Sequence, residues 1–198
     1  MKIVKIEEIN LGEVIEILRN RGVIVVPTDT VYGLAADAKS PEAVDNIYKI
    51  KKRPKIKHVP FFVASIADIK SIVHINERQE NFLQKIWPGK ITVVLPFDHF
   101  GTVGFRIPNY DFVTKLLIEF GPLVGTSANL SDKPEHTKIQ EIIDEFTNSE
   151  VKPDLIVDGG DLPESRPSTV VSLLGNELKI LREGAVKEAE LQKIWSML

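Results

Sequence analysis

The clearest structural signal in the chain is VIVVPTDTVYGL, residues 23–34. Four consecutive apolar residues that stop at Pro27 are typical of a short buried strand. Polar side chains follow at once, namely Thr28, Asp29, Thr30 and Tyr32. Loops at strand ends often hold ligands in α/β folds, whereas Thr and Asp also cap helices. The segment therefore predicts a buried strand whose exit either lines a binding site or caps a helix.

Segments on both sides of this strand alternate between helical and extended patterns. Ser40-Pro41-Glu42 predicts a helix start, because Ser caps well, Pro suits the first position and an acid favours the first turn. Further helices are predicted over residues 11–18, 77–87, 111–120 and 137–146, and from residue 187 onward. Strands are predicted over residues 91–95, 103–107, 123–124, 155–157, 169–171 and 178–180, with a hairpin turn at Gly175-Asn176. This mixture predicts an α/β fold built on a twisted mixed sheet with flanking helices.

The composition is that of an ordinary globular protein. The chain has 198 residues, of which 43% are hydrophobic and 27% charged, so we expect a single domain over residues 1–198. It has no cysteine, which excludes disulfides, thiol nucleophiles and Cys-based zinc sites. No apolar run approaches the ~20 residues of a membrane span, and the N-terminus lacks a signal-peptide core. We therefore expect a cytoplasmic protein with no membrane partner.

The common catalytic motifs are missing. Gly89-Lys90 is not a P-loop because Gln84 stands where its first glycine belongs, and G-x-G-x-x-G is absent. Ser127 does not lie in a G-x-S-x-G elbow. The four histidines are scattered without metal-ligand spacing, so no protein-held metal is expected. Hydride transfer, zinc hydrolysis and serine hydrolysis have no support in the sequence.

A basic run stands out in a chain of net charge −3. It packs six basic residues into nine positions: Lys49, Lys51, Lys52, Arg53, Lys55 and Lys57. Lys51 continues the helical spacing of Val44, Ile47 and Tyr48, so it shares their buried face. A lysine there either extends its amine to solvent or meets an anion, and we favour phosphate binding. The alternative for the run as a whole is a solvated basic face.

Three more segments combine polar residues with predicted strands. Arg106 is embedded in the apolar GFRIP, which is costly unless the arginine pairs with an acid or holds a ligand carboxylate. GTSAN, residues 125–129, offers hydroxyls and an amide, either to a pocket or to a simple turn. RPSTVV, residues 166–171, leads into a strand, and Arg182 leaves the next one. Together these segments predict a concave site for a small anionic ligand, such as a nucleotide bound without a P-loop.

In this order the segments resemble the YrdC/Sua5/TsaC family of threonylcarbamoyl-AMP synthases. The resemblance rests on PTDTVYGL, IYKIKKRP, WPGKITVVL, GFRIP, GPLVGTSANLSDKP, PSTVV and ILREGAV. It implies a YrdC-like fold around a deep, positively charged cavity. It also implies a nucleotidyltransferase that converts ATP, L-threonine and bicarbonate to threonylcarbamoyl-AMP and pyrophosphate. Mg would enter with ATP and no tightly bound cofactor is expected, while a partner complex would complete the t6A modification of tRNA.

The resemblance also assigns residues. Threonine-binding positions match Thr30, Arg106, Ser127 and Ser168. ATP-binding positions match Lys51, Arg53, Lys57, Thr102, Asn129, Thr137 and Arg182. Lys51 and Arg53 are the implied catalytic pair, because they would stabilise charge on the phosphates. No metal ligand is implied.

The stretch around residues 55–62 departs from the family. Lys57, His58-Val59 and Phe62 replace residues usual there, and Lys90 adds a charge to WPGKITVVL. These departures leave open a YciO-like paralogue that binds RNA or a nucleotide without the synthase reaction. An RNA-binding module that contacts tRNA or double-stranded RNA is a second alternative. A carbamoyl-transfer enzyme of the hydrogenase-maturation type is a third.

Overall fold

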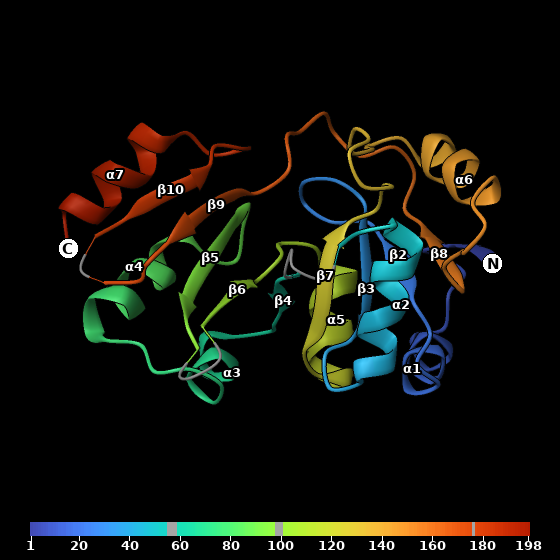
Figure 1. Cartoon of the computed structure of the whole chain (residues 1–198), viewed down its shortest axis with the longest axis horizontal. Coiled ribbons are helices and arrows are strands. Elements are labelled where there is room, and N and C mark those ends of the chain that lie inside the picture. Colours follow the sequence, from blue (N-terminus) through green and yellow to red (C-terminus); the bar gives the residue numbers. More distant parts are fainter. Residues whose placement is uncertain (55–58, 98–100, 176) are drawn as a thin grey trace.

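A ten-stranded mixed sheet runs through the whole molecule (Figure 1). The structure is a computed structural model that describes residues 1–54, 59–97, 101–175 and 177–198. The strands are β1 (Lys2–Lys5), β2 (Ile24–Val26), β3 (Gly33–Asp37), β4 (Phe61–Phe62), β5 (Ile91–Pro96), β6 (Thr102–Arg106), β7 (Leu123–Ser127), β8 (Leu155–Asp158), β9 (Thr169–Ser172) and β10 (Lys179–Arg182). The helices are α1 (Leu11–Arg19), α2 (Pro41–Lys51), α3 (Ile66–Lys70), α4 (Glu77–Ile86), α5 (Asp111–Phe120), α6 (Ile139–Thr147) and α7 (Glu188–Ser196).

The short strand β4 joins two halves of this sheet. The strand order is β1-β8-β2-β3-β7-β4-β6-β5-β9-β10. β4 pairs antiparallel with β7 on one side and parallel with β6 on the other. Figure 1 shows α1, α2, α5 and α6 around the half that contains β1, β2, β3, β7 and β8. The remaining helices lie with β5, β6, β9 and β10. The sheet is therefore continuous between its halves through β4, a strand of two residues.

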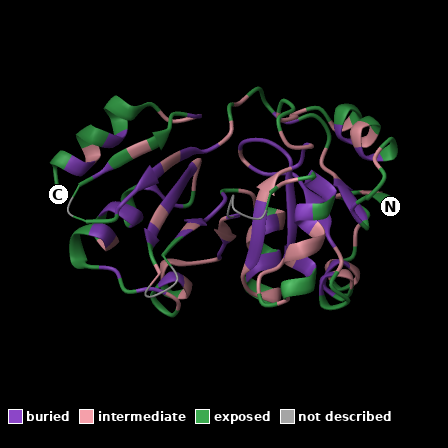
Figure 2. Cartoon of the chain, viewed as in Figure 1, coloured by how far each residue is buried: buried purple, intermediate pink, exposed green. Residues whose placement is uncertain are grey.

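The first half of the sheet is covered on both faces. Val25 packs with α2 and α6 in one apolar cluster, while Ile24 and Val26 pack with α1 and α5 in another. Successive side chains on a strand point to opposite faces, so a strand buried on both faces must be apolar throughout. This explains why the run before Pro27 is continuous rather than alternating (Figure 2, purple).

The second half packs its helices on one face only. Val93 on β5, Phe105 on β6 and Val171 on β9 lie in an apolar cluster with Phe82 of α4 and Trp195 of α7. The alternate residues of the same three strands point away from this cluster and line a cavity: Thr92, Val94, Thr102, Gly104, Arg106 and Val170. The period-two alternation of these strands therefore turns their polar face toward the site.

Most predicted elements are confirmed, and the differences have simple causes. The predicted helices and strands are present with ends shifted by a few residues, and β9 and β10 form the predicted antiparallel hairpin, although Asn176 lies outside the described residues. The strand predicted at 123–124 extends to Ser127, because β3 pairs along its whole length. GTS is therefore strand rather than turn. β1, β3, β4 and α3 were not predicted; β4 and α3 are too short for a periodic signal.

The described part of the chain was also searched for membrane-spanning segments. None of its helices is long and apolar enough to cross a bilayer.

Candidate functional site

A cavity of about 480 Å³ lies between the two halves of the sheet. Its volume falls in the range of small-molecule sites. Nine of the predicted site residues line it: Thr30, Lys51, Arg53, Thr102, Arg106, Ser127, Asn129, Ser168 and Arg182. The fold thus gathers segments from residue 30 to residue 182, which supports the prediction of one concave site.

Two predicted residues are not brought to the cavity wall by the described structure. Thr137 is half-buried outside the described lining residues, and its carbonyl accepts a hydrogen bond from the Leu162 amide at 2.8 Å. Lys57 lies outside the described residues, as do Lys55 and His58. The roles of Thr137 and Lys57 stay predictions.

Cationic residues outnumber acidic ones in the described cavity wall. Its cationic residues are Lys51, Arg53, Arg106, Lys133 and Arg182, and its acidic residues are Asp132 and Glu135. Guanidinium and ammonium groups are the natural partners of phosphate and carboxylate oxygens. The wall is therefore suited to an anionic ligand, although the chain as a whole is mildly acidic.

Arg106 is a buried member of this group, with 5% of its side chain exposed. Nη2 donates to Asp29 Oδ1 at 2.7 Å, Nη1 to Thr30 Oγ1 at 3.0 Å, and Nε to the Gly89 carbonyl at 3.1 Å. Burial lowers the pKa of this guanidinium, and the Asp29 carboxylate opposes that change. Of the two possibilities that the sequence left open, pairing with an acid is realised, and Arg106 still faces the cavity.

The β2–β3 loop is held by its own hydroxyls. Thr28 Oγ1 donates to the Val31 carbonyl at 2.7 Å and accepts from the Thr30 amide at 3.1 Å. The segment leads into β3 rather than a helix, so the helix-cap alternative is wrong. The reason is that Gly33 and the residues after it pair with both β2 and β7.

The sequence patterns assigned no role to Asp29, which lies beside Arg106. Its side chain is 9% exposed, and its second oxygen, Oδ2, accepts no hydrogen bond among the described residues. The sequence feature that indicated an acidic partner was the embedded Arg106, since a buried arginine requires one. Which acid supplies that partner depends on contacts across 77 positions.

Lys51 lies on the buried face of α2, as its helical phase predicts, with 2% of the residue exposed. Its ammonium donates to the carbonyls of Ser127 and Asn129 at 2.6 and 2.7 Å and to Asn129 Oδ1 at 2.9 Å. Burial, together with the nearby charge of Arg53, lowers the pKa of Lys51 to about 8. All three ammonium hydrogens thus have partners at the end of β7 and on the loop after it, so Lys51 shapes that turn of the chain as well as lining the cavity.

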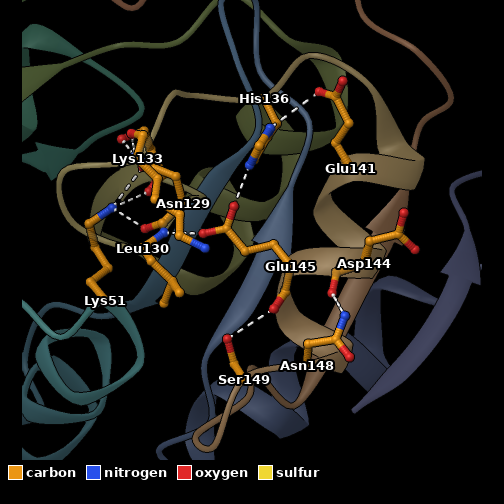
Figure 3. Close-up of polar contacts among 11 residues, drawn as sticks. Lys51, Asn129, Leu130, Lys133, His136, Glu141, Asp144, Glu145, Asn148 and Ser149 are labelled. Atoms are coloured by element: carbon orange, nitrogen blue, oxygen red, sulfur yellow. Dashed lines mark hydrogen bonds and ion pairs between the residues drawn. The ribbon is translucent and has the colours of Figure 1, made fainter.

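Asn129 is the centre of this polar group. Its Oδ1 also accepts from Ser127 Oγ at 2.7 Å, and its Nδ2 donates to the Lys133 carbonyl at 2.6 Å (Figure 3). Asn129 is buried and Ser127 half-buried. Asn129 Oδ1 thus accepts from both the Lys51 ammonium and the Ser127 hydroxyl.

The opposite wall carries a second hydroxyl pair. Ser168 Oγ lies 2.8 Å from Thr92 Oγ1, and Arg182 Nη2 donates to the Ser168 carbonyl at 2.8 Å. Thr169 is fully buried and accepts from the amides of Gly184 and Val186 at 2.9 and 3.0 Å. These bonds tie the exit of β10 to the entrance of β9. They explain how two segments fourteen positions apart present Ser168 and Arg182 together.

The sequence as a whole was compared with known protein families and solved structures. The Sua5/YciO/YrdC model, described as telomere recombination, matches residues 16–184. The chain belongs to this family. The family resemblance predicted from the motifs is confirmed, and so is the mixed α/β fold.

Individual relatives extend the comparison. The chain is 30% identical to a Bacillus subtilis threonylcarbamoyl-AMP synthase, over 93% of this chain but 56% of that protein. A Methanocaldococcus jannaschii protein that carries the same name provisionally is 31% identical over 97% of both chains. The chain thus spans little more than half of some relatives and nearly all of others.

Two solved structures frame the fold. Pyrococcus abyssi Sua5 in complex with L-threonine superposes with a TM-score of 0.88 at 29% identity, covering 98% of this chain and 61% of that one. Escherichia coli YciO superposes with a TM-score of 0.81 at 23% identity, covering 94% and 96%. The second likeness supports the fold alone.

Proposed function

We propose that this protein is an L-threonylcarbamoyl-AMP synthase, a nucleotidyltransferase that uses ATP, L-threonine and bicarbonate. The observation that carries the proposal is the cavity, where one enclosed arginine and a separate group of cations face the same space. Family membership and the relatives named for this activity support it. So does the threonine complex of the Pyrococcus abyssi structure, whose fold is closely similar.

Arg106 would orient the threonine carboxylate. A guanidinium has five N–H donors, and three of those on Arg106 already have protein partners. The cavity-facing remainder can meet a carboxylate, while Thr30, Ser127 and Ser168 supply hydroxyls to the rest of the amino acid. Such positioning holds the reacting groups in a productive geometry and so lowers the entropic part of the barrier.

The other cations would neutralise the triphosphate. Lys51, Arg53 and Arg182 line the same cavity, and so do Thr102 and Asn129. Threonine's amine would take up bicarbonate as a carbamate with loss of water. The carbamate oxygen would then attack the α-phosphate and expel pyrophosphate. No protein nucleophile is required, so the residues contribute position and charge stabilisation.

Magnesium would enter with ATP, as it commonly does with nucleotide substrates, and would supply positive charge at the phosphates. The described residues contain no group of three His, Asp or Glu side chains arranged to hold a metal ion. The acids on the described wall, Asp132 and Glu135, could contact the waters of such an ion. The product would pass to the enzyme complex that completes t6A in tRNA, in the cytoplasm.

The direct test is pyrophosphate release from Mg-ATP. We expect release that requires both threonine and bicarbonate, and threonylcarbamoyl-AMP as the product by mass spectrometry. Release without threonine, or none with all substrates present, would overturn the proposal. A salt-sensitive RNA gel shift without ATP turnover would instead favour the RNA-binding alternative.

Two substitutions separate the proposed roles. Arg53→Ala should reduce turnover by about 10²-fold, as for other lost electrostatic donors. Lys49→Ala is the matched control, because Lys49 belongs to the same basic run but is exposed on α2. Arg106→Ala should raise the threonine concentration required for half-maximal rate. Equal effects at Arg53 and Lys49 would contradict the phosphate assignment.

A further inference from the structure

The segment between β7 and α6 forms part of the cavity wall without regular secondary structure. Besides Asn129, four of its residues line the cavity: Ser131, Asp132, Lys133 and Glu135. They have no ladder or helix bonds to fix their positions. What holds residues 131–135 in place therefore bears on the shape of the site.

One carboxylate holds both ends of this segment. Glu145 of α6 accepts a hydrogen bond from the Leu130 amide at one oxygen and contacts His136 Nε2 at the other (Figure 3). Leu130 directly precedes residues 131–135 and His136 directly follows them. The Glu145 side chain is 6% exposed and is not among the described lining residues of the cavity. Glu145 thus clasps residues 131–135 at both ends without being among the described lining residues.

The surrounding charges favour this arrangement. His136 Nδ1 lies 3.2 Å from Glu141 Oε2, so the imidazole sits between two carboxylates with 16% of its side chain exposed. Hydrogen bonds between charged groups are stronger than neutral ones, particularly when shielded from water.

Residues of the segment also contact predicted site residues. The Ser131 amide donates to the Lys51 carbonyl at 2.9 Å, and the Lys133 carbonyl accepts from Asn129 at 2.6 Å. Displacement of residues 131–135 would therefore disturb the Asn129 and Lys51 group, on the side of the cavity proposed for ATP. Glu145 would act through these contacts, because it does not itself reach the cavity.

We propose that Glu145 is a positioning residue that clasps residues 131–135 in their cavity-lining shape and so preorganises the nucleotide side of the site. This inference deepens the proposed function and rests on it. A segment ordered before binding spares the ligand the entropy of ordering it. Loss of the clasp should weaken ATP binding more than it slows the reaction of bound ATP.

The test compares three variants in the full chain. Glu145→Ala removes both contacts. Glu145→Gln keeps an oxygen for the Leu130 amide but removes the charge, which otherwise raises the pKa of Lys51. Glu141→Ala is the matched control on the same helix, because Glu141 contacts His136 but not Leu130. The readouts are the Kd of Mg-ATP by calorimetry, kcat and KM, and hydrogen exchange of residues 130–136.

We expect Glu145→Ala to raise the Kd and KM for ATP about tenfold or more, as the loss of a charge-assisted hydrogen bond implies. The kcat at saturating ATP should change less than about threefold, and exchange of residues 130–136 should accelerate. Glu145→Gln should lie between wild type and Glu145→Ala, and Glu141→Ala should stay near wild type. Equal weakening by Gln and Ala would assign the effect to charge at Lys51 and overturn the clasp. So would unchanged exchange in Glu145→Ala.

Two further measurements keep the outcome decisive. If Glu145→Ala does not fold, His136→Ala releases one end of the segment while the Leu130 contact remains, and the same rise in KM and exchange is expected. Unchanged values in that variant would overturn the proposal. If the wild-type chain shows no threonine-dependent turnover, the proposed function fails. Hydrogen exchange and nucleotide affinity would still decide whether Glu145 clasps the segment.

Discussion

Replacing Asp29 by alanine should destabilise the folded chain by about 3 kcal/mol, because it leaves the Arg106 guanidinium without its anionic partner in a buried site. The two side chains are 9% and 5% exposed, and the atoms that join them are 2.7 Å apart. Such a pair is shielded from the solvent that would otherwise compensate the lost charge.

The magnitude follows from what remains around Arg106. Breaking a buried ion pair by removing one partner costs about 3–5 kcal/mol. We expect the lower end, because Arg106 keeps its hydrogen bonds to Thr30 and Gly89. Asp29→Asn should cost about half as much, since an amide oxygen can still accept from Nη2 but carries no charge.

Urea unfolding provides the assay. Trp87 and Trp195 both lie in the apolar cluster of the second half of the sheet. Their fluorescence therefore reports on the half of the molecule to which Arg106 belongs. A double-mutant cycle with Arg106→Gln isolates the interaction between the two residues. We expect a coupling energy above about 1 kcal/mol, the double variant being less destabilised than the sum of the singles. Additive effects, or a loss below about 1 kcal/mol for Asp29→Ala, would refute the reasoning.

Three further predictions test other parts of the site. Because burial lowers the pKa of Lys51 to about 8 from 10.5, the unfolded chain still holds a proton between these values that the folded chain has lost. The free energy of unfolding should therefore rise with pH across that window relative to Lys51→Met, and parallel pH profiles in urea would contradict it. Gly184→Ala should cost about 1–3 kcal/mol, measured as a lower thermal midpoint, because its Cβ would lie 2.7 Å from the Ser168 carbonyl carbon. Gly125→Ala should cost a similar ~1–3 kcal/mol, since the new Cβ would lie 2.5 Å from Phe62 Cδ2 and overlap the ring. The double variant with Phe62→Leu should be less destabilised than the sum of the two single variants, and strict additivity would argue against that contact.

Much of the fold was readable from the sequence because its local signals agree. The continuous apolar run before Pro27 indicated a buried strand, and Ser40-Pro41 marked the start of α2. β3 was missed, because its residues Gly33–Asp37 have weak strand preference and are ordered by β2 and β7 on either side. The same pairing overturned the helix-cap alternative for the loop before it.

The candidate site was predicted as a set of residues rather than as a geometry. Helical phase alone placed Lys51 on the buried face of α2. Arg106 required a partner because it is embedded in an apolar strand. Neither signal could show that Lys51 would donate to the carbonyls of Ser127 and Asn129, since those contacts join segments far apart in the chain.

The sequence by itself therefore determined the class of fold, the family and the kinds of side chain that gather at the site. These properties follow from local periodicity, from motif order and from the cost of burying charge. Only the tertiary structure decided which acid pairs with Arg106, and that one carboxylate, Glu145, contacts both Leu130 and His136. The physical reason is that such partners are selected by packing between elements. Their choice depends on how the strands and helices meet across the molecule, which no local pattern of residues encodes.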